Sequence, residues 1–78
     1  MKTTYDPRYD IAYIRLQERT AEVETIKVSD ELNIDITPDG TVYGIELLHA
    51  NTQFNLATET NLIYVNEAQG SVQEVALA

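Results

Sequence analysis

The chain has 78 residues, among them 13 Asp and Glu, five Lys and Arg, one His and no Cys, and its net charge at pH 7 is −8. These numbers exclude disulfides and thiolate metal sites, and the single histidine, His49, excludes an all-histidine metal cage. The excess of acid also argues against binding to nucleic-acid phosphates, which requires clustered Lys and Arg.

A chain of this length predicts one small domain, placed over residues 1–78. Domains near this size remove only roughly 60–65% of their unfolded surface from water, so one core leaves them on the order of 3–5 kcal/mol stable. Association with another chain is therefore an expected source of further stability. No stretch is long or apolar enough to cross a bilayer, and no apolar run follows Lys2, so we expect a cytoplasmic protein without a signal peptide.

The charges are unevenly distributed along the chain. All Lys and Arg precede Val28, whereas residues 28–78 contain eight acidic residues and no Lys or Arg. Such a block is typical of a solubilising surface or of a surface that binds a basic partner.

Period-two alternation predicts β strands over residues 11–16, 22–28, 32–36 and 42–48, preceded by a turn at residues 6–10. In the first strand both faces carry apolar residues, so both faces need a covering layer. One face holds Ala12, Ile14 and Leu16, and the other holds Ile11, Tyr13 and Arg15.

The register of the third and fourth strands follows from parity. The apolar residues of the third strand are even-numbered (Leu32, Ile34, Ile36), and those of the fourth are mainly odd-numbered (Tyr43, Ile45, Leu47). Paired residues share a face, so their numbers must add to an odd sum. A three-residue loop with positions 37 and 41 paired breaks this rule, so we expect a four-residue connection or a bulge that repairs the parity.

The pattern changes after residue 48. Asn51 or Thr52 is expected to cap a short helix that ends near Ala57. Residues 62–65 and 72–77 read as two strands around a turn at residues 66–70, and a helix over residues 59–69 is the alternative. The expected fold class is mainly β (α+β), an antiparallel meander of about four strands followed by a short helix and a C-terminal strand or hairpin.

Five segments together carry a family resemblance: YDP at 5–7, DIAYIRL at 10–16, VSD at 28–30, LNIDI at 32–36 and DGTVYGIELL at 39–48. The chain resembles the uncharacterised prokaryotic family called domain of unknown function 2283, over a core of about residues 5–50 with a divergent tail at residues 58–78. The resemblance implies a β-meander followed by a helix, and no activity, cofactor or catalytic residue. It also implies, as an expectation, a small basic protein partner of the kind found in toxin–antitoxin gene pairs.

Candidate metal-ligating or acid–base groups are few. Asp35 and Glu46 are expected on the solvent side of neighbouring strands, where two carboxylates bind a hard cation or transfer protons. Diagonal neighbours lie roughly 7–8 Å apart, however, which is too far to share a proton. His49, together with Asp39 or Glu46, is the remaining candidate, although a lone histidine at a strand end is commonly a surface or capping group. We therefore predict no catalytic residue, no bound metal and no cofactor.

The leading functional prediction is a non-enzymatic protein-binding module that forms a homodimer, with a small basic protein as a further partner and with no nucleic acid or membrane bound. Tyrosine is enriched at protein interfaces, and the chain has five. The dimer is expected to use the sheet face that the helix leaves open, through Ile11, Tyr13, Val23 and Val42. The alternatives are a small metal-dependent enzyme or ligand-binding protein that uses the acidic residues, and a purely structural homo-oligomer.

Overall fold

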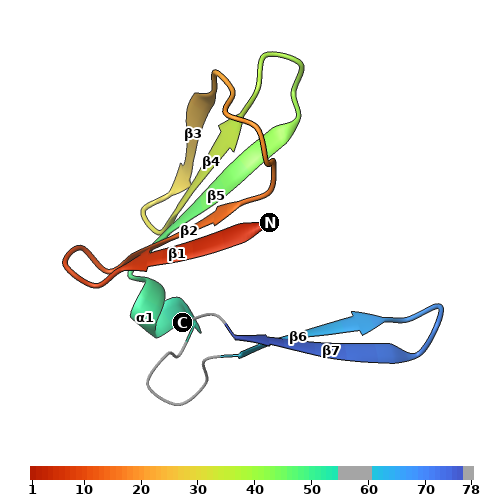
Figure 1. The fold of residues 1–78 in the computed structure, drawn as a ribbon. Helices are drawn as coiled ribbons and strands as arrows, with labels where there is room; N and C mark the ends of the chain where they lie inside the picture. The colour runs from red at the N-terminus through yellow and green to blue at the C-terminus, as the bar shows by residue number, and fades with distance from the viewer. Residues whose placement is uncertain (55–60, 77–78) are drawn as a thin grey trace.

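The computed structural model describes residues 1–54 and 61–76 and contains two separate antiparallel sheets and one short helix (Figure 1). The predicted fold class is confirmed: the fold is mainly β, with a short helix and a C-terminal hairpin. The elements are β1 (Lys2–Asp6), β2 (Ile11–Arg15), β3 (Glu24–Ser29), β4 (Leu32–Ile36), β5 (Val42–Leu48), α1 (Ala50–Phe54), β6 (Asn61–Asn66) and β7 (Ser71–Ala76).

Strand β1 was not predicted, because its Lys-Thr-Thr-Tyr sequence lacks aliphatic alternation. It forms a hairpin with β2 in which Tyr5 pairs with Ala12. The turn follows the expected chemistry, since an Asp6 side-chain oxygen accepts the Arg8 backbone N–H at 3.0 Å. The turn ends at Asp10, which has a φ of 56°.

The five-stranded sheet has the order β1-β2-β5-β4-β3. Strand β2 therefore pairs with β5 and not with β3, and the chain crosses from the middle of the sheet to its far edge before β3, β4 and β5 return by hairpins (Figure 1). The order of β2 to β5 is that of a Greek key. As a result, β2, β5 and β4 are the three inner strands.

The parity argument for β4 and β5 is confirmed, with the bulge as the solution. Thr37 donates its backbone N–H to the Thr41 carbonyl at 2.9 Å, so a three-residue loop closes the turn. One register step follows: Ile36 pairs with Val42, whereas Asp35 pairs with Gly44. The extra residue restores the odd sum and returns the aliphatic side chains of both strands to one face.

Helix α1 begins at Ala50, so the prediction that Asn51 or Thr52 caps it is wrong. His49 precedes the helix with a φ of 52°, and its carbonyl accepts the backbone N–H of Thr52. A side chain remote in sequence does the capping, since an Asp10 carboxylate oxygen accepts the Asn51 backbone N–H at 2.8 Å. The predicted end near Ala57 lies outside the described residues.

The C-terminal segment forms the β6–β7 hairpin, and the alternative of a helix over residues 59–69 is wrong. The turn contains Gly70 at a φ of 66°, a conformation that glycine adopts without steric cost. Residue 77, which was expected in the last strand, lies outside the described residues. No helix within residues 1–54 and 61–76 is long and apolar enough to cross a membrane.

Candidate interaction surface

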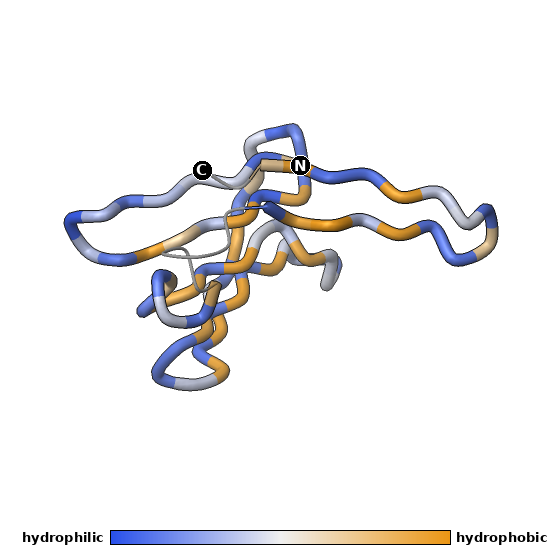
Figure 2. The backbone as a smooth tube through the Cα atoms, turned by 90° about the horizontal axis from the view of Figure 1, so that it is seen from below, coloured by the Kyte–Doolittle hydropathy of each residue, from blue (hydrophilic) through white to orange (hydrophobic). Residues whose placement is uncertain are grey.

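One face of the five-stranded sheet is aliphatic over β2, β4 and β5, whereas the edge strands also place Thr3, Tyr5 and Glu24 on it. Cross-strand pairs such as Ile34 with Ile45 and Ile34 with Ile26 place the branched side chains of neighbouring strands side by side. Hydrophobic and hydrophilic residues alternate along these strands in Figure 2. We call this surface the aliphatic face, and its inner-strand and edge-strand residues are Ala12, Ile14, Ile26, Leu32, Ile34, Ile36, Ile45 and Leu47.

Little of the described part of the chain covers this face. Among the described hydrophobic residues, only Ala12 and Ala50 are buried, and no large side chain there is fully enclosed. The larger residues of the aliphatic face are half-buried, and Ile26 is 43% exposed. In a folded domain such a face normally packs against a second layer.

Helix α1 lies at one end of the sheet and does not form that second layer (Figure 1). The Ala50 backbone N–H donates to the Asp10 carbonyl at 3.0 Å, and the Gln53 side chain donates to the Glu31 carbonyl at 3.0 Å. Both acceptors belong to turns at the same end of the sheet. The expectation that the helix shields one face needs correction, because a helix of five residues closes only the end.

The opposite face, which we call the polar face, is organised by Tyr13. Its phenol crosses Gly44 and donates a hydrogen bond to an Asp35 carboxylate oxygen at 2.7 Å. A Cβ at position 44 would lie 2.2 Å from the Tyr13 hydroxyl oxygen, so only glycine fits beneath the ring. Thr25 donates to the other Asp35 oxygen at 2.6 Å. Burial, followed by the hydrogen bond to Asp35, raises the pKa of Tyr13 well above its ordinary value.

The predicted metal or acid–base candidates are not brought together. Asp35 is occupied by Tyr13 and Thr25, while Glu46 accepts a hydrogen bond from the Asn33 amide at 2.9 Å. His49 lies beyond the end of β5, with its Nδ1 3.9 Å from a Glu31 oxygen. Within residues 1–54 and 61–76, no group of three or more His, Asp or Glu side chains is placed to hold a metal ion.

His49 and Asp39 flank β5 at opposite ends. Seven strand residues separate the two ends by roughly 23 Å, so this pair does not form one site. Asp39 instead stabilises its own turn, where it accepts the Thr41 backbone N–H at 3.1 Å.

The four predicted interface residues do not form one patch either. Ile11 and Tyr13 lie on the polar face, as alternation predicted, and Tyr13 is engaged within the chain. Val42 pairs with Ile36 of the aliphatic face, and Val23 precedes the first paired residue of β3. The open surface could have been identified from the even-numbered apolar residues of β4 and the odd-numbered apolar residues of β5. It was assigned to a core because a covering helix was assumed.

Tyr43 also departs from the expected core set. As the extra residue of the bulge, it lines a hollow on the polar face together with Tyr13, Thr4, Lys2 and Arg15. The aliphatic face therefore contains the odd-numbered residues of β5 only from Ile45 onward.

The five-stranded sheet and the start of the helix are also the part of the chain that one protein-family model matches. The family model described as "Protein of unknown function (DUF2283)" matches residues 2–51, which is more than half of the chain, so the protein is a member of this family. The match spans β1 to β5 and the first residues of α1, while the β6–β7 hairpin follows it. Comparisons with curated proteins and with solved structures gave no match.

Proposed function

We propose that this protein is a non-enzymatic protein-binding module whose aliphatic face binds a second copy of the chain. This proposal is supported by a continuous branched-aliphatic surface on the inner strands that no other element within residues 1–54 and 61–76 covers. Monomeric proteins rarely expose contiguous apolar patches of this kind, and a two-fold interface buries the patch of each protomer at once.

The exposed area supports a dimer of ordinary size. The chain exposes 5908 Å², whereas a compact monomer of 8.8 kDa exposes about 4,800 Å². The excess of about 1,100 Å² exceeds the roughly 800 Å² that each partner contributes to a standard stable interface. The radius of gyration agrees, at 13.9 Å against about 11.5 Å for a compact chain of this length.

The test uses two variants that add the same charge to opposite faces of the sheet. Ile26→Lys places an ammonium group on the edge of the aliphatic face, and Thr4→Lys places one on an exposed position of the polar face. Size-exclusion chromatography with light scattering is expected to give a dimer for the parent and Thr4→Lys, and a monomer for Ile26→Lys. If both variants keep the mass of the parent dimer, the interface lies elsewhere.

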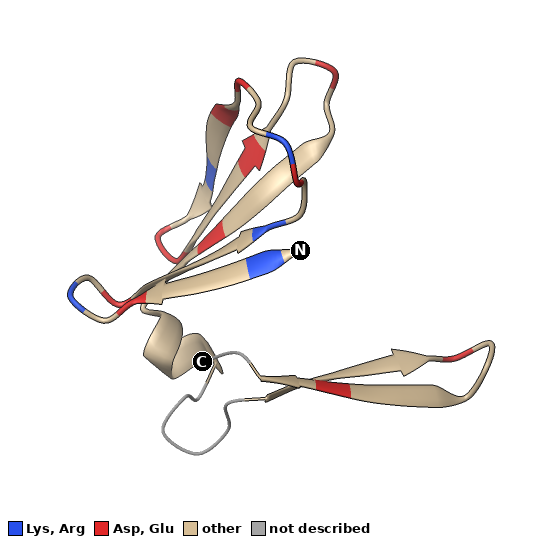
Figure 3. Cartoon of the chain, viewed as in Figure 1, with Lys and Arg blue, Asp and Glu red and all other residues tan. Residues whose placement is uncertain are grey.

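A basic protein is a second candidate partner, and the charge distribution favours it. Between the start of β4 and the end of β7, Figure 3 shows acidic residues and no Lys or Arg in the part of the chain that is described. This candidate is tested by co-expressing the chain with a small basic protein that an adjacent gene encodes. A complex that weakens as ionic strength rises is expected, and its absence at low salt rejects this candidate. The cytoplasmic location expected from the sequence stays a prediction that fractionation tests.

A further inference from the structure

The β6–β7 hairpin carries apolar side chains on both of its faces. Leu62 pairs with Val75 on one face, and Val65 pairs with Val72 on the other. A lone two-stranded hairpin is at best marginally stable in water and needs a packing partner. Within the described residues, however, its strands pack chiefly on each other and form a sheet of their own.

Both faces of the hairpin expose apolar residues, including Tyr64 at 55% on the face of Leu62 and Val75. At the base of the hairpin, Leu62 and Val75 are 40% and 39% exposed, whereas Val65 and Val72 near the tip are 52% and 66% exposed. Ile63 lies on the same face as this second pair and is 60% exposed. We call Ile63, Val65 and Val72 the hairpin tip cluster.

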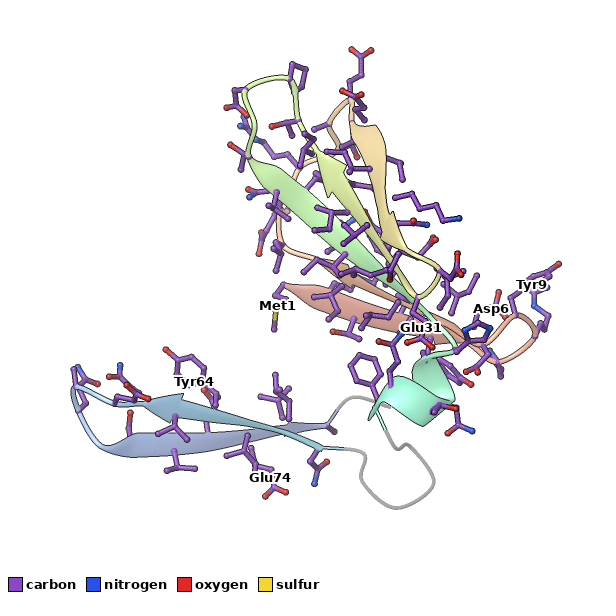
Figure 4. All side chains as sticks on the ribbon, turned by 180° about the vertical axis from the view of Figure 1, so that it is seen from behind. Met1, Asp6, Tyr9, Glu31, Tyr64 and Glu74 are labelled. Carbon is purple, nitrogen blue, oxygen red and sulfur yellow. The ribbon has the colours of Figure 1, made fainter. Side chains whose placement is uncertain are left out.

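The tip cluster points away from the chain's own five-stranded sheet. Ile63 pairs with Glu74, so the cluster and Glu74 share one face of the hairpin, and Tyr64 marks the other face. In Figure 4, Tyr64 projects to the side on which the sheet lies, and Glu74 projects to the opposite side. Among the described residues, no strand other than β6 and β7 therefore faces the tip cluster.

We propose that the tip cluster packs on the aliphatic face of a second copy of the chain, and that the second copy returns the same contact. We call this reciprocal packing arm exchange, because the β6–β7 hairpin acts as the arm. It rests on the proposed self-association and specifies its geometry. The two surfaces match in chemistry, because β-branched side chains of the arm meet the Ile and Leu rows of the inner strands. A reciprocal contact covers both exposed surfaces of each protomer.

The charges favour an arm on a sheet over an arm on another arm. The described hairpin carries Glu67 and Glu74 and no Lys or Arg (Figure 3). Two hairpins packed together would bring these carboxylates near their symmetry copies. The five-stranded sheet and its loops hold all five basic residues, but Lys2, Arg15 and Lys27 belong to the polar face, since they pair with Arg15, Gly44 and Asn33. An arm laid on the aliphatic face of the partner avoids this approach of the hairpin carboxylates.

The absence of cysteine from the chain makes the geometry testable with full-length protein. Val72→Cys places a thiol on the tip cluster, and Ile34→Cys places one in the middle of the aliphatic face. The two variants, carrying tags of different mass, are mixed and mildly oxidised. A disulfide between the two differently tagged chains is expected. Gln73→Cys is the matched control, because this position is adjacent on β7 but lies on the other face of the hairpin, and it is expected to react at least tenfold more slowly with Ile34→Cys.

Two results of the disulfide experiment would overturn arm exchange, and each indicates a different packing. Rapid disulfide formation between two Ile34→Cys chains, without the mixed product, overturns arm exchange and leaves the aliphatic face as a self-packing surface. A chain that carries both Val72→Cys and Ile34→Cys is the further control. A disulfide within one monomeric copy of it shows that the arm folds over its own sheet, which also overturns the proposal.

Dissociation provides a second readout that does not depend on thiol geometry. Val72→Asp adds a charge to the tip cluster, and Gln73→Asp adds the same charge to the other face of the hairpin. Val72→Asp is expected to raise the dimer dissociation constant at least tenfold more than Gln73→Asp does. Equal constants contradict arm exchange, and a dimer that Ile26→Lys still dissociates then keeps the proposed function intact.

Discussion

Tyr13 is the residue on which the polar face depends. Its ring occupies the space above Gly44 and its hydroxyl is bonded to Asp35, so three strands are joined by one side chain. Glycine in a strand interior ordinarily weakens the sheet, and an aromatic ring laid across it replaces the missing side-chain contacts.

Gly44→Ala tests this packing. The new methyl group displaces the Tyr13 ring and breaks its hydrogen bond, so the free energy of unfolding is expected to fall by about 1–3 kcal/mol. Urea denaturation measures the change, and the same substitution in a Tyr13→Ala background is the control. If the cost of Gly44→Ala is undiminished there, the ring is not its cause.

The raised pKa of Tyr13 gives a pH dependence with a defined sign. In the unfolded chain the phenol ionises near pH 10, whereas in the folded chain it keeps its proton to higher pH. The folded state therefore binds more protons above pH 10, and the contribution of Tyr13 to stability is full below that pH and declines as pH rises. Urea midpoints of the parent are expected to fall more steeply above pH 10 than those of Tyr13→Phe. Parallel curves contradict the shift.

At the scale of elements, alternation predicted β2 to β5 to within about two residues, because period two is unambiguous where Ile and Leu alternate with polar residues. Parity also predicted either a four-residue connection or a bulge, and the bulge is present, since a one-residue slip would have turned Glu46 into the aliphatic face. The pairing of β2 with β5 was not predictable by these means, because it joins residues 29 to 37 positions apart. The position of the helix depends on that same long-range pairing.

Asp10 connects the helix to the first hairpin. One of its carboxylate oxygens accepts the Tyr5 hydroxyl at 2.9 Å and the Asn51 backbone N–H at 2.8 Å. Asp10→Ala removes this shared acceptor and is expected to lower the free energy of unfolding by about 1–3 kcal/mol. Asp10→Asn retains an acceptor oxygen and tolerates the positive φ of 56°. Thermal denaturation should therefore rank Asp10→Asn above Asp10→Ala, and equal melting temperatures contradict the role of the shared oxygen.

At the scale of the whole molecule, two apolar surfaces lack a packing partner among the described residues, the aliphatic face and the hairpin tip cluster. From sequence alone, the aliphatic residues were identifiable but their exposure was not. The interface through Ile11, Tyr13, Val23 and Val42 stays a prediction; Ile11 and Tyr13 lie on the polar face, whereas Val42 pairs with Ile36 of the aliphatic face. If folding and association are coupled, as we propose, stability depends on protein concentration. The melting temperature is expected to rise with each tenfold increase in concentration, whereas a constant value indicates a stable monomer.

Sedimentation equilibrium of the full chain tests the central claim most directly, because it reports mass without regard to shape. Over micromolar concentrations, the proposed assembly predicts a mass of twice 8.8 kDa, with dissociation on dilution. A mass of 8.8 kDa throughout that range would contradict self-association through the aliphatic face.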